Sequence, residues 1–292
     1  PSALIDTLKE RIRHADSRNR AVVFEKWSPL GQSAQTLADR SSELGTWMDS
    51  AGRRVWTGFP LRAHHRCAEP MFSIANRIAY DSQMVQARTA FPAVSSPLGR
   101  SRWLDVQGHT ADTQLVQEEL ACLRRCMTAF LNDWPVIEGQ DGPREASVFV
   151  ISPFRKVAWH CRSLLRAMNI PEERVRCGTI HTFQGREADI VLLVLGSSPG
   201  QVGWGSRQWA SRTPNILNVA LTRAKSLIYV IGNWHDWRRH PFFDVLSEEL
   251  PVESGDYPLS GNSRSENSSC LRLSGLFRPA GEAFSPSAGA QP

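Results

Sequence analysis

The sequence predicts an α/β fold in which a mostly parallel β-sheet carries helices on both faces. Three aliphatic runs with the character of buried strands, residues 147–151, 189–195 and 226–231, are separated by segments with helical spacing of apolar residues. Strands that alternate with helices favour a parallel sheet covered on both sides. The 292 residues are 41% hydrophobic and 22% charged, which is ordinary globular composition with enough apolar material for a large core.

Residues 1–60 are expected to form a helix, a short strand and a connector. The first helix is predicted by apolar residues at helical spacing, namely Leu4, Ile5, Leu8 and Ile12. Ala21 to Phe24 predicts a short strand, and a connector punctuated by Trp, Pro and Gly is expected to follow through Gly58.

Residues 61–250 carry the α/β pattern and are expected to form one domain. The predicted elements, in chain order, are a helix from Pro70, a helix over 112–131, strand 147–151, a helix over 154–168, strands 175–180 and 189–195, a helix over 215–225, and strand 226–231. Asp112 or Thr113 is expected to cap the second of these helices, because short polar side chains accept from the first N–H groups.

Residues 251–292 are rich in Ser, Gly, Pro and Asn and have almost no periodic apolar pattern. Such a segment cannot bury enough surface to offset its ordering entropy, so we expect a disordered C-terminal tail. The longest aliphatic run, Ile190 to Leu195, is far shorter than the ~20 apolar residues of a membrane span. No membrane partner is therefore expected.

The six cysteines, at positions 67, 122, 126, 161, 177 and 270, form no C-x-x-C pair, so we expect reduced, mostly buried thiols in a cytoplasmic protein and no metal site. The net charge of +5 favours an anionic partner mildly, and all but four of the 34 basic residues are arginines. Arginine suits bidentate phosphate contacts, although a coding bias toward arginine explains the count equally well.

Polar residues gather in GTIHTFQGREAD (178–189), directly before the apolar run that begins at Ile190. Three further segments have a similar character, LRAHHRC (61–67), SPFRKV (152–157) and NVALTRAK (218–225). In open α/β sheets, ligands bind beyond the carboxyl ends of strands, and we expect all four loops to gather along one such edge. Each segment alone is also compatible with local structure such as a helix start or a surface charge.

In order and sequence, GTIHTFQGREADIV followed by NVALTRAK resembles motifs V and VI of superfamily 1 helicases of the 5′-to-3′ group. SPFRKV resembles motif IV, and LRAHHRCAEPM resembles the segment that opens the second motor domain. WSPLGQSAQTLADR (27–40) is similar to a connector between motor domains, and the whole resemblance covers roughly residues 20–235. It implies a RecA-like second motor domain over 61–250, preceded over 1–60 by a remnant of the first domain and the connector.

The resemblance also implies a role for individual residues. Arg66 and Arg223 would reach the γ-phosphate of ATP, where a positioned arginine is worth ~10³–10⁵ in rate. Gln184, Gly185 and Glu187 would lie near the nucleotide, with Glu187 accepting from the ribose hydroxyl. The residues expected to contact single-stranded DNA or RNA are Ser152, Thr179, His181 and Thr182.

Several neighbouring residues allow two interpretations. Asp189 is either a strand-edge cap or a functional group, and Phe154 is either core, which we favour, or a base-stacking face. Lys225 is expected at a solvated helix end, where cations are favoured. The sequence departs from the family at His65, where Tyr is common, and at Val157, where motif IV often has Gln. Adenine stacking at His65 and a polar contact at Val157 are therefore not expected.

A complete motor needs the loop G-x-x-x-x-G-K-[ST] and an acidic pair for Mg²⁺, but no lysine here follows glycine and Asp-Glu occurs nowhere. The resemblance places Pro1 just after motif III. We therefore expect the C-terminal half of an ATP- and Mg²⁺-dependent helicase, inactive as an ATPase without an N-terminal RecA-like domain. The alternatives are a stand-alone nucleic-acid-binding or regulatory module, and a small-molecule α/β enzyme that leaves the paired motifs unexplained.

Overall fold

The computed structural model describes residues 2–14, 16–28, 34–50, 53–58, 62–88, 90–108, 113–139, 142–183 and 185–256. The helices are α1 (Ser2–Arg11), α2 (Ser17–Trp27), α3 (Ala34–Ser41), α4 (Met71–Ala79), α5 (Gln117–Asn132), α6 (Arg155–Ala167), the 3₁₀ turn η1 (Ile180–Phe183), α7 (Trp204–Ala210), α8 (Asn215–Leu221), α9 (Trp234–Trp237) and α10 (Phe243–Glu249). The strands are β1 (Thr46–Ser50), β2 (Arg53–Thr57), β3 (Ala63–His64), β4 (Val85–Gln86), β5 (Val94–Ser95), β6 (Arg102–Asp105), β7 (Val136–Gly139), β8 (Gly142–Glu145), β9 (Val148–Ser152), β10 (Val175–Thr179), β11 (Ala188–Val194), β12 (Ala224–Gly232) and β13 (Val252–Ser254).

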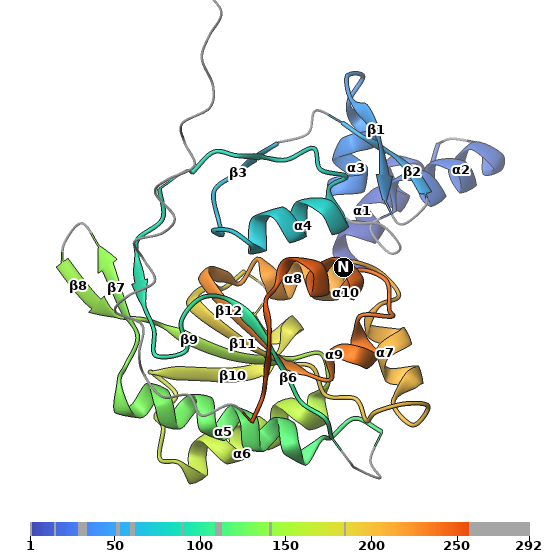
Figure 1. Cartoon of the computed structure of the whole chain (residues 1–292). Helices are drawn as coiled ribbons and strands as arrows, with labels where there is room; N and C mark the ends of the chain where they lie inside the picture. The colour runs from blue at the N-terminus through green and yellow to red at the C-terminus, as the bar shows by residue number, and fades with distance from the viewer. Residues whose placement is uncertain are drawn as a thin grey trace, which may run out of the picture.

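The core is a six-stranded sheet in the order β10-β9-β11-β12-β6-β13, and every neighbouring pair is parallel. Helices α5 and α6 lie below this sheet in Figure 1, while α4, α8 and α10 lie above it. The prediction of a mostly parallel α/β sheet with helices on both faces is confirmed, and the four predicted strands lie together in it as β9, β10, β11 and β12. Among the described residues, no helix has the length and apolar character needed to span a membrane.

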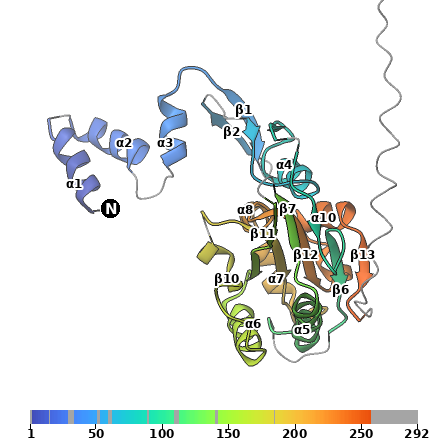
Figure 2. The ribbon, with the colours of Figure 1, turned by 90° about the vertical axis from the view of Figure 1, so that its left-hand side faces the viewer.

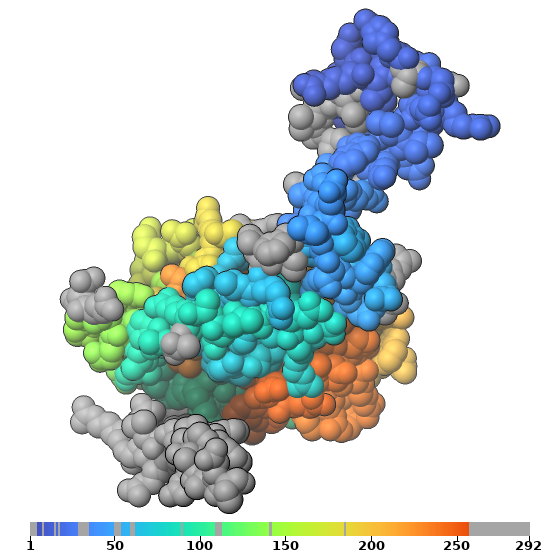
Figure 3. Space-filling model, turned by 90° about the horizontal axis from the view of Figure 1, so that it is seen from above, coloured from blue at the N-terminus to red at the C-terminus, as the bar shows by residue number. Residues whose placement is uncertain are grey.

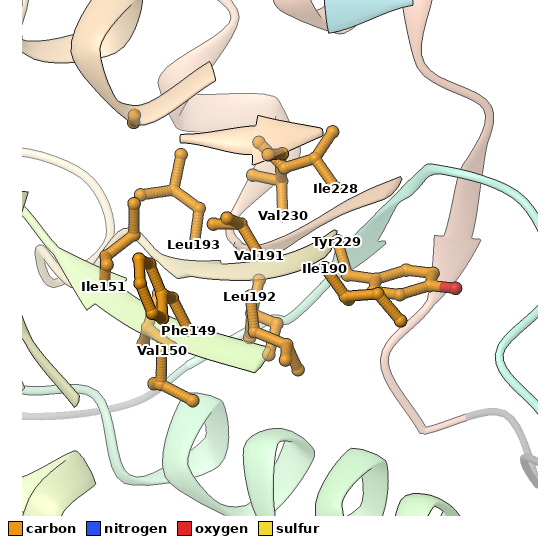
Figure 4. Packing of buried hydrophobic residues seen from close by; sticks show 14 of the residues in the cluster. Phe149, Val150, Ile151, Ile190, Val191, Leu192, Leu193, Ile228, Tyr229 and Val230 are labelled. Atoms are coloured by element: carbon orange, nitrogen blue, oxygen red, sulfur yellow. The ribbon is translucent and has the colours of Figure 1, made fainter. Parts of the chain in front are cut away.

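The centre of the sheet is apolar on both faces. All residues of β9 and β11 are buried, and the side chains of β9, β11 and β12 project to both sides of the sheet (Figure 4). Strands β9 and β11 therefore lack the alternation of a half-exposed strand, which is the pattern expected for a parallel sheet covered by helices. Polar groups on these strands can reach solvent only at the strand ends.

The segment before the core lies apart from it. Figure 2 shows α1, α2 and α3 extending away from the sheet, and in Figure 3 the same segment projects from the body. The strand predicted over Ala21–Phe24 is wrong, because these residues lie within α2. Asp16 caps that helix by accepting from the Asn19 N–H at 2.9 Å, and arginine, glutamate and lysine around the two valines are good helix formers.

Two helix boundaries differ from the sequence prediction. Helix α5 begins after Val116 rather than at residue 112, so the predicted Thr113 cap is wrong, and Asp112 lies outside the described residues. The Thr113 and Gln114 carbonyls instead accept from Ser198 and Ser197 N–H. Helix α8 ends at Leu221.

Strand β6, between β12 and β13, was not predicted, because four residues with two buried apolar side chains carry too little pattern. The predicted tail contributes β13, which pairs with β6. The sheet therefore includes three residues that the sequence assigned to the tail, and the rest of the predicted tail, from residue 257, lies outside the described residues.

Asp189, at the start of β11, ties the central strand to the β7–β8 hairpin. Its carboxylate accepts from Arg144 Nη1 and Nη2 at 2.8 and 2.7 Å, and from the N–H and Oγ of Ser147 at 2.8 and 2.6 Å. Burial alone would raise the pKa of Asp189, but the hydrogen bonds from Arg144 and Ser147 outweigh it and lower the pKa to about 2. These contacts favour the interpretation of Asp189 as a strand-edge cap.

Replacing Asp189 by asparagine is expected to lower the free energy of unfolding at pH 7 by about 1.5–3 kcal/mol, because it removes charge-assisted hydrogen bonds from a buried acceptor. A carboxyl group with a lowered folded pKa stabilises the fold above its unfolded pKa, about 3.9, and loses that contribution as pH falls toward 2. The difference between wild type and Asp189→Asn in urea unfolding should therefore shrink between pH 5 and pH 2.5.

Glu145→Gln is the matched control, since Glu145 lies on the same hairpin and its ion pair with Arg174, before β10, joins two substantially exposed side chains. It should cost less than about 1 kcal/mol. Equal losses in the two variants would contradict the anchoring role of Asp189.

Candidate functional site

Arg66, Glu187 and Arg223 lie together at the amino-terminal ends of β11 and β12. Arg66 Nε lies 3.7 Å from Glu187 Oε1, and Arg66 is largely exposed. The Ala68 N–H donates to the Lys225 carbonyl at 2.8 Å, which fixes the Arg66 loop against the start of β12. The Ala188 N–H donates to the Arg223 carbonyl at 2.9 Å, so the residues that precede the two strands are also held side by side.

The Arg223 side chain is buried, and backbone carbonyls hold its guanidinium in place. Nε donates to the Val219 carbonyl at 3.1 Å, and Nη1 donates to the carbonyls of Phe183 and Arg186 at 3.2 and 2.9 Å. Burial lowers the pKa of Arg223, and the positive charge of Arg66 lowers it further. The guanidinium still keeps its proton at neutral pH, so two like charges share this site with one carboxylate. An anion bound here would relieve that repulsion.

The loop between β10 and β11 requires glycine at one position. Gly185 has a φ of +84°, a conformation that L side chains rarely adopt, whereas an added Cβ would meet no neighbour among the described residues. The backbone turn therefore explains this glycine. Gln184 lies outside the described residues.

A second group of predicted residues lies at the carboxyl ends of β9 and β10. Thr179 Oγ1 and Thr182 Oγ1 are 2.9 Å apart, and His181 is exposed beside them. Thr179 and His181 line an open cleft of about 680 Å³. The complete lining among the described residues is Gln114, Pro153, Phe154, Arg155, Thr179, His181, Gly205, Ser206 and Trp209.

Ser152 lies beside this group but faces inward. Its side chain is buried, and its Oγ accepts from the Phe154 N–H at 3.3 Å, which forms the turn into α6. Phe154 is also buried, as favoured from the sequence, and its ring lies 5.8 Å from that of Trp209. The structure therefore places Thr179 and His181 on an accessible surface and Ser152 behind it.

The expectation that all motif loops gather along one edge of the sheet is wrong. Thr179 and Ser152 end β10 and β9, whereas Glu187 and Arg223 precede β11 and β12, and these strands are parallel. The two groups therefore lie at opposite ends of strands, separated by roughly the 20 Å that the seven residues of β11 span. The expectation that ligands bind beyond the carboxyl ends of strands fails for this loop. The loop from 180 to 187 starts at the carboxyl end of β10 and finishes at the amino end of β11.

Other residues around the site also differ from expectation. Lys225 lies in β12 rather than at a helix end, because α8 stops four residues earlier. Val157 is buried in the core and His65 is exposed. Of the five described cysteines, all free thiols, those at 67, 122, 126 and 161 are buried and Cys177 is partly buried. Within the described ranges no cluster of His, Cys, Asp and Glu could hold a metal ion.

Sequence reasoning missed the pair that shapes the Arg66 loop. His64 is buried, with Nε2 3.0 Å from Cys67 Sγ and 3.3 Å from the Cys67 backbone nitrogen. Burial lowers the pKa of His64, and burial raises the pKa of Cys67 to about 12, so the pair is neutral at physiological pH. The spacing His64-x-x-Cys67 was visible in the sequence, but only the fold shows that it closes the turn next to Arg66.

Comparison with known proteins identifies relatives of this chain. Residues 48–235 match the model of a family described as an AAA domain. The chain is 24% identical over 196 residues to the DNA replication ATP-dependent helicase/nuclease DNA2 of Gallus gallus, covering 66% of this chain and 18% of that protein. It is 31% identical over 114 residues to the RNA helicase Mov10l1 of Homo sapiens, covering 38% of this chain and 9% of that protein.

A third relative is the DNA polymerase alpha-associated DNA helicase A of Saccharomyces cerevisiae, which is 33% identical over 89 residues, or 30% of this chain and 12% of that protein. The chain thus spans less than a fifth of the length of each of these relatives.

Proposed function

Because the chain belongs to this AAA domain family and carries a RecA-like domain of the superfamily 1 helicase type, we propose that it is the second motor domain of an ATP-dependent 5′-to-3′ helicase or translocase. In this role it supplies arginines to the nucleotide and polar groups to a single strand of DNA or RNA. It does not hydrolyse ATP by itself.

The observation that carries the proposal is the proximity of Arg66, Glu187 and Arg223. Two guanidinium groups beside one carboxylate suit a nucleotide, because the guanidiniums can face phosphate oxygens while the carboxylate accepts from a ribose hydroxyl. Arg223 is already oriented by three carbonyls, which reduces the reorganisation needed when charge develops on a phosphate. Arg66 is exposed and only loosely paired, so it can turn from Glu187 toward an anion.

A second RecA-like domain is proposed as the partner, because this sequence has no G-x-x-x-x-G-K-[ST] loop and no Asp-Glu pair. That domain would hold the phosphates and Mg²⁺ of ATP, which supplies the transferable γ-phosphoryl group. The residues of this chain contribute by binding and orienting the phosphate from the opposite side of the cleft. Arg66 and Arg223 then neutralise the charge that increases as the bond to the leaving group breaks.

The second candidate is a stand-alone nucleic-acid-binding or regulatory module without ATPase activity. It is favoured by the absence of the phosphate loop from this sequence. It is also favoured by the cleft at the carboxyl edge, whose lining does not include Arg66, Glu187 or Arg223. The two functions differ in whether Arg66 and Arg223 matter to ATP turnover when a phosphate-loop domain is present in the same protein.

In a protein that carries both motor domains, Arg223→Ala should lower nucleic-acid-stimulated ATP turnover by about 10³-fold or more, because the arginine acts most strongly in the transition state. Arg223→Lys should rescue poorly, since an ammonium lacks the planar fork that three carbonyls now orient. Turnover and single-strand affinity without nucleotide are measured together, and the affinity should change little.

Arg66→Ala separates catalysis from folding, because Arg223 is buried and its loss also leaves carbonyls unpaired, whereas Arg66 is exposed. Arg66→Ala should lower turnover steeply without changing the Tm. Arg62→Ala, an exposed arginine that contacts the Gln83 carbonyl, is the matched control and should leave turnover unchanged. Normal turnover in both Arg66→Ala and Arg223→Ala would favour the stand-alone module.

The 292-residue chain alone is expected to bind single-stranded oligonucleotides weakly and without sequence preference, since phosphate contacts dominate. Contact with about three phosphates gives a slope of roughly −2 for log affinity against log salt, so a tenfold rise in salt should weaken binding about 100-fold. Fluorescence anisotropy between 20 and 200 mM NaCl measures this slope. Absence of binding at 20 mM NaCl would show that the carboxyl-edge cleft does not take nucleic acid.

A further inference from the structure

Helix α7, which follows β11, exposes an unusual amount of apolar surface. Trp204 and Trp209 on this helix are 43% and 49% exposed, and Val202 just before it is 54% exposed. Neither tryptophan belongs to the four motif segments at 61–67, 152–157, 178–189 and 218–225. Exposed indoles that gather on one short segment mark a contact surface more often than a random surface residue does.

The two tryptophans have different surroundings. Trp204 packs against His240, with ring centroids 4.6 Å apart, and does not line the carboxyl-edge cleft. Trp209 lines that cleft and lies 5.8 Å from Phe154, at a tilt of 39°. One face of the cleft is therefore a half-exposed indole supported by a buried aromatic ring.

The lining of the same cleft also includes polar side chains. Arg155, Thr179 and His181 supply a guanidinium, a hydroxyl and an imidazole to the lining. Gly205 contributes open space, because an added Cβ there would meet no neighbour within 4 Å among the described residues. An open cleft lined by both an indole and hydrogen-bond donors suits a ligand with a flat ring and an anionic backbone, which describes a nucleotide within a strand.

We propose that Trp209 stacks on an unpaired base of a single strand, while the adjacent backbone runs past Arg155, Thr179 and His181. This inference rests on the proposed nucleic-acid binding and adds a stacking platform outside the recognised motifs. Duplex is excluded by the same contact, because its bases are already stacked on each other and present no free face to the indole. Stacking at Trp209 therefore favours a single strand over a duplex in this cleft.

The test compares an oligo-dT with an abasic oligonucleotide of the same length and charge, using the full 292-residue chain at low salt. The ratio of the two affinities isolates base contacts from phosphate contacts. Wild type should prefer oligo-dT, and Trp209→Ala should weaken oligo-dT binding by roughly 5- to 150-fold, the range found for base–aromatic stacking. Abasic binding should change little in this variant, so the ratio should fall toward one.

Trp204→Ala is the matched control, since it removes a tryptophan of similar exposure from the same helix but outside the cleft, and its affinity ratio should equal that of wild type. Gly205→Leu is a second variant in case Trp209→Ala does not fold. It blocks the cleft by adding a side chain where there is room for one. It should reduce oligo-dT binding while the Tm is maintained.

The inference is overturned if Trp209→Ala binds oligo-dT as wild type does, or if it weakens oligo-dT and abasic binding equally. Either result leaves the proposed nucleic-acid binding intact. Failure of wild type to bind either oligonucleotide would overturn both.

Discussion

The complete burial of β11 is the constraint on which the rest of this domain depends. All seven residues of the strand are apolar or internally bonded, and β9 and β12 flank it in parallel. Because no polar ligand can approach the middle of such a strand, chemistry can occur only where the chain enters and leaves the sheet. Glu187 directly precedes β11. Gly196 and Ser197 follow the strand, in the segment between β11 and α7.

A buried arginine at the entrance is stable because the backbone satisfies it. The carbonyls that Arg223 binds belong to helix α8, at Val219, and to the loop before β11, at Phe183 and Arg186. Removing a buried charge from water is costly, and here hydrogen bonds to backbone acceptors offset much of that cost. The same contacts make the two motif loops a single structural unit, which explains why residues about 40 positions apart meet at one site.

Long-range pattern was readable from the sequence, and local geometry was not. The runs that became β9, β11 and β12 are long and apolar enough to predict a buried parallel sheet. Val22 and Val23 suggested a strand, but a cap at Asp16 and good helix formers nearby decided for α2. The strand β6 could not be predicted, because its stability comes from β12 and β13 on either side rather than from its four residues.

The candidate site shows the same division. The resemblance to helicase motifs assigned Arg66, Glu187 and Arg223 to one ligand, and the structure brings these three side chains near one another. Burial of Ser152 and Asp189 could not be read from motif positions, since it depends on which neighbouring segment supplies a hydrogen bond. Trp209 was missed for the opposite reason, because an isolated tryptophan has no pattern until the fold places it beside Phe154.

The segment from Ile180 to Glu187 connects the two groups of predicted site residues, which lie at opposite ends of the strands. It starts beside the cleft at the carboxyl edge and ends at the cluster of Arg66, Glu187 and Arg223. Its path includes one turn that needs glycine, at Gly185, and two carbonyls held by Arg223. A shift of the Arg223 guanidinium toward an anion must therefore either break those two hydrogen bonds or move the loop with it. Thr182, in the same segment, is hydrogen-bonded to Thr179 at the other edge, so this one segment carries residues of both proposed ligand sites.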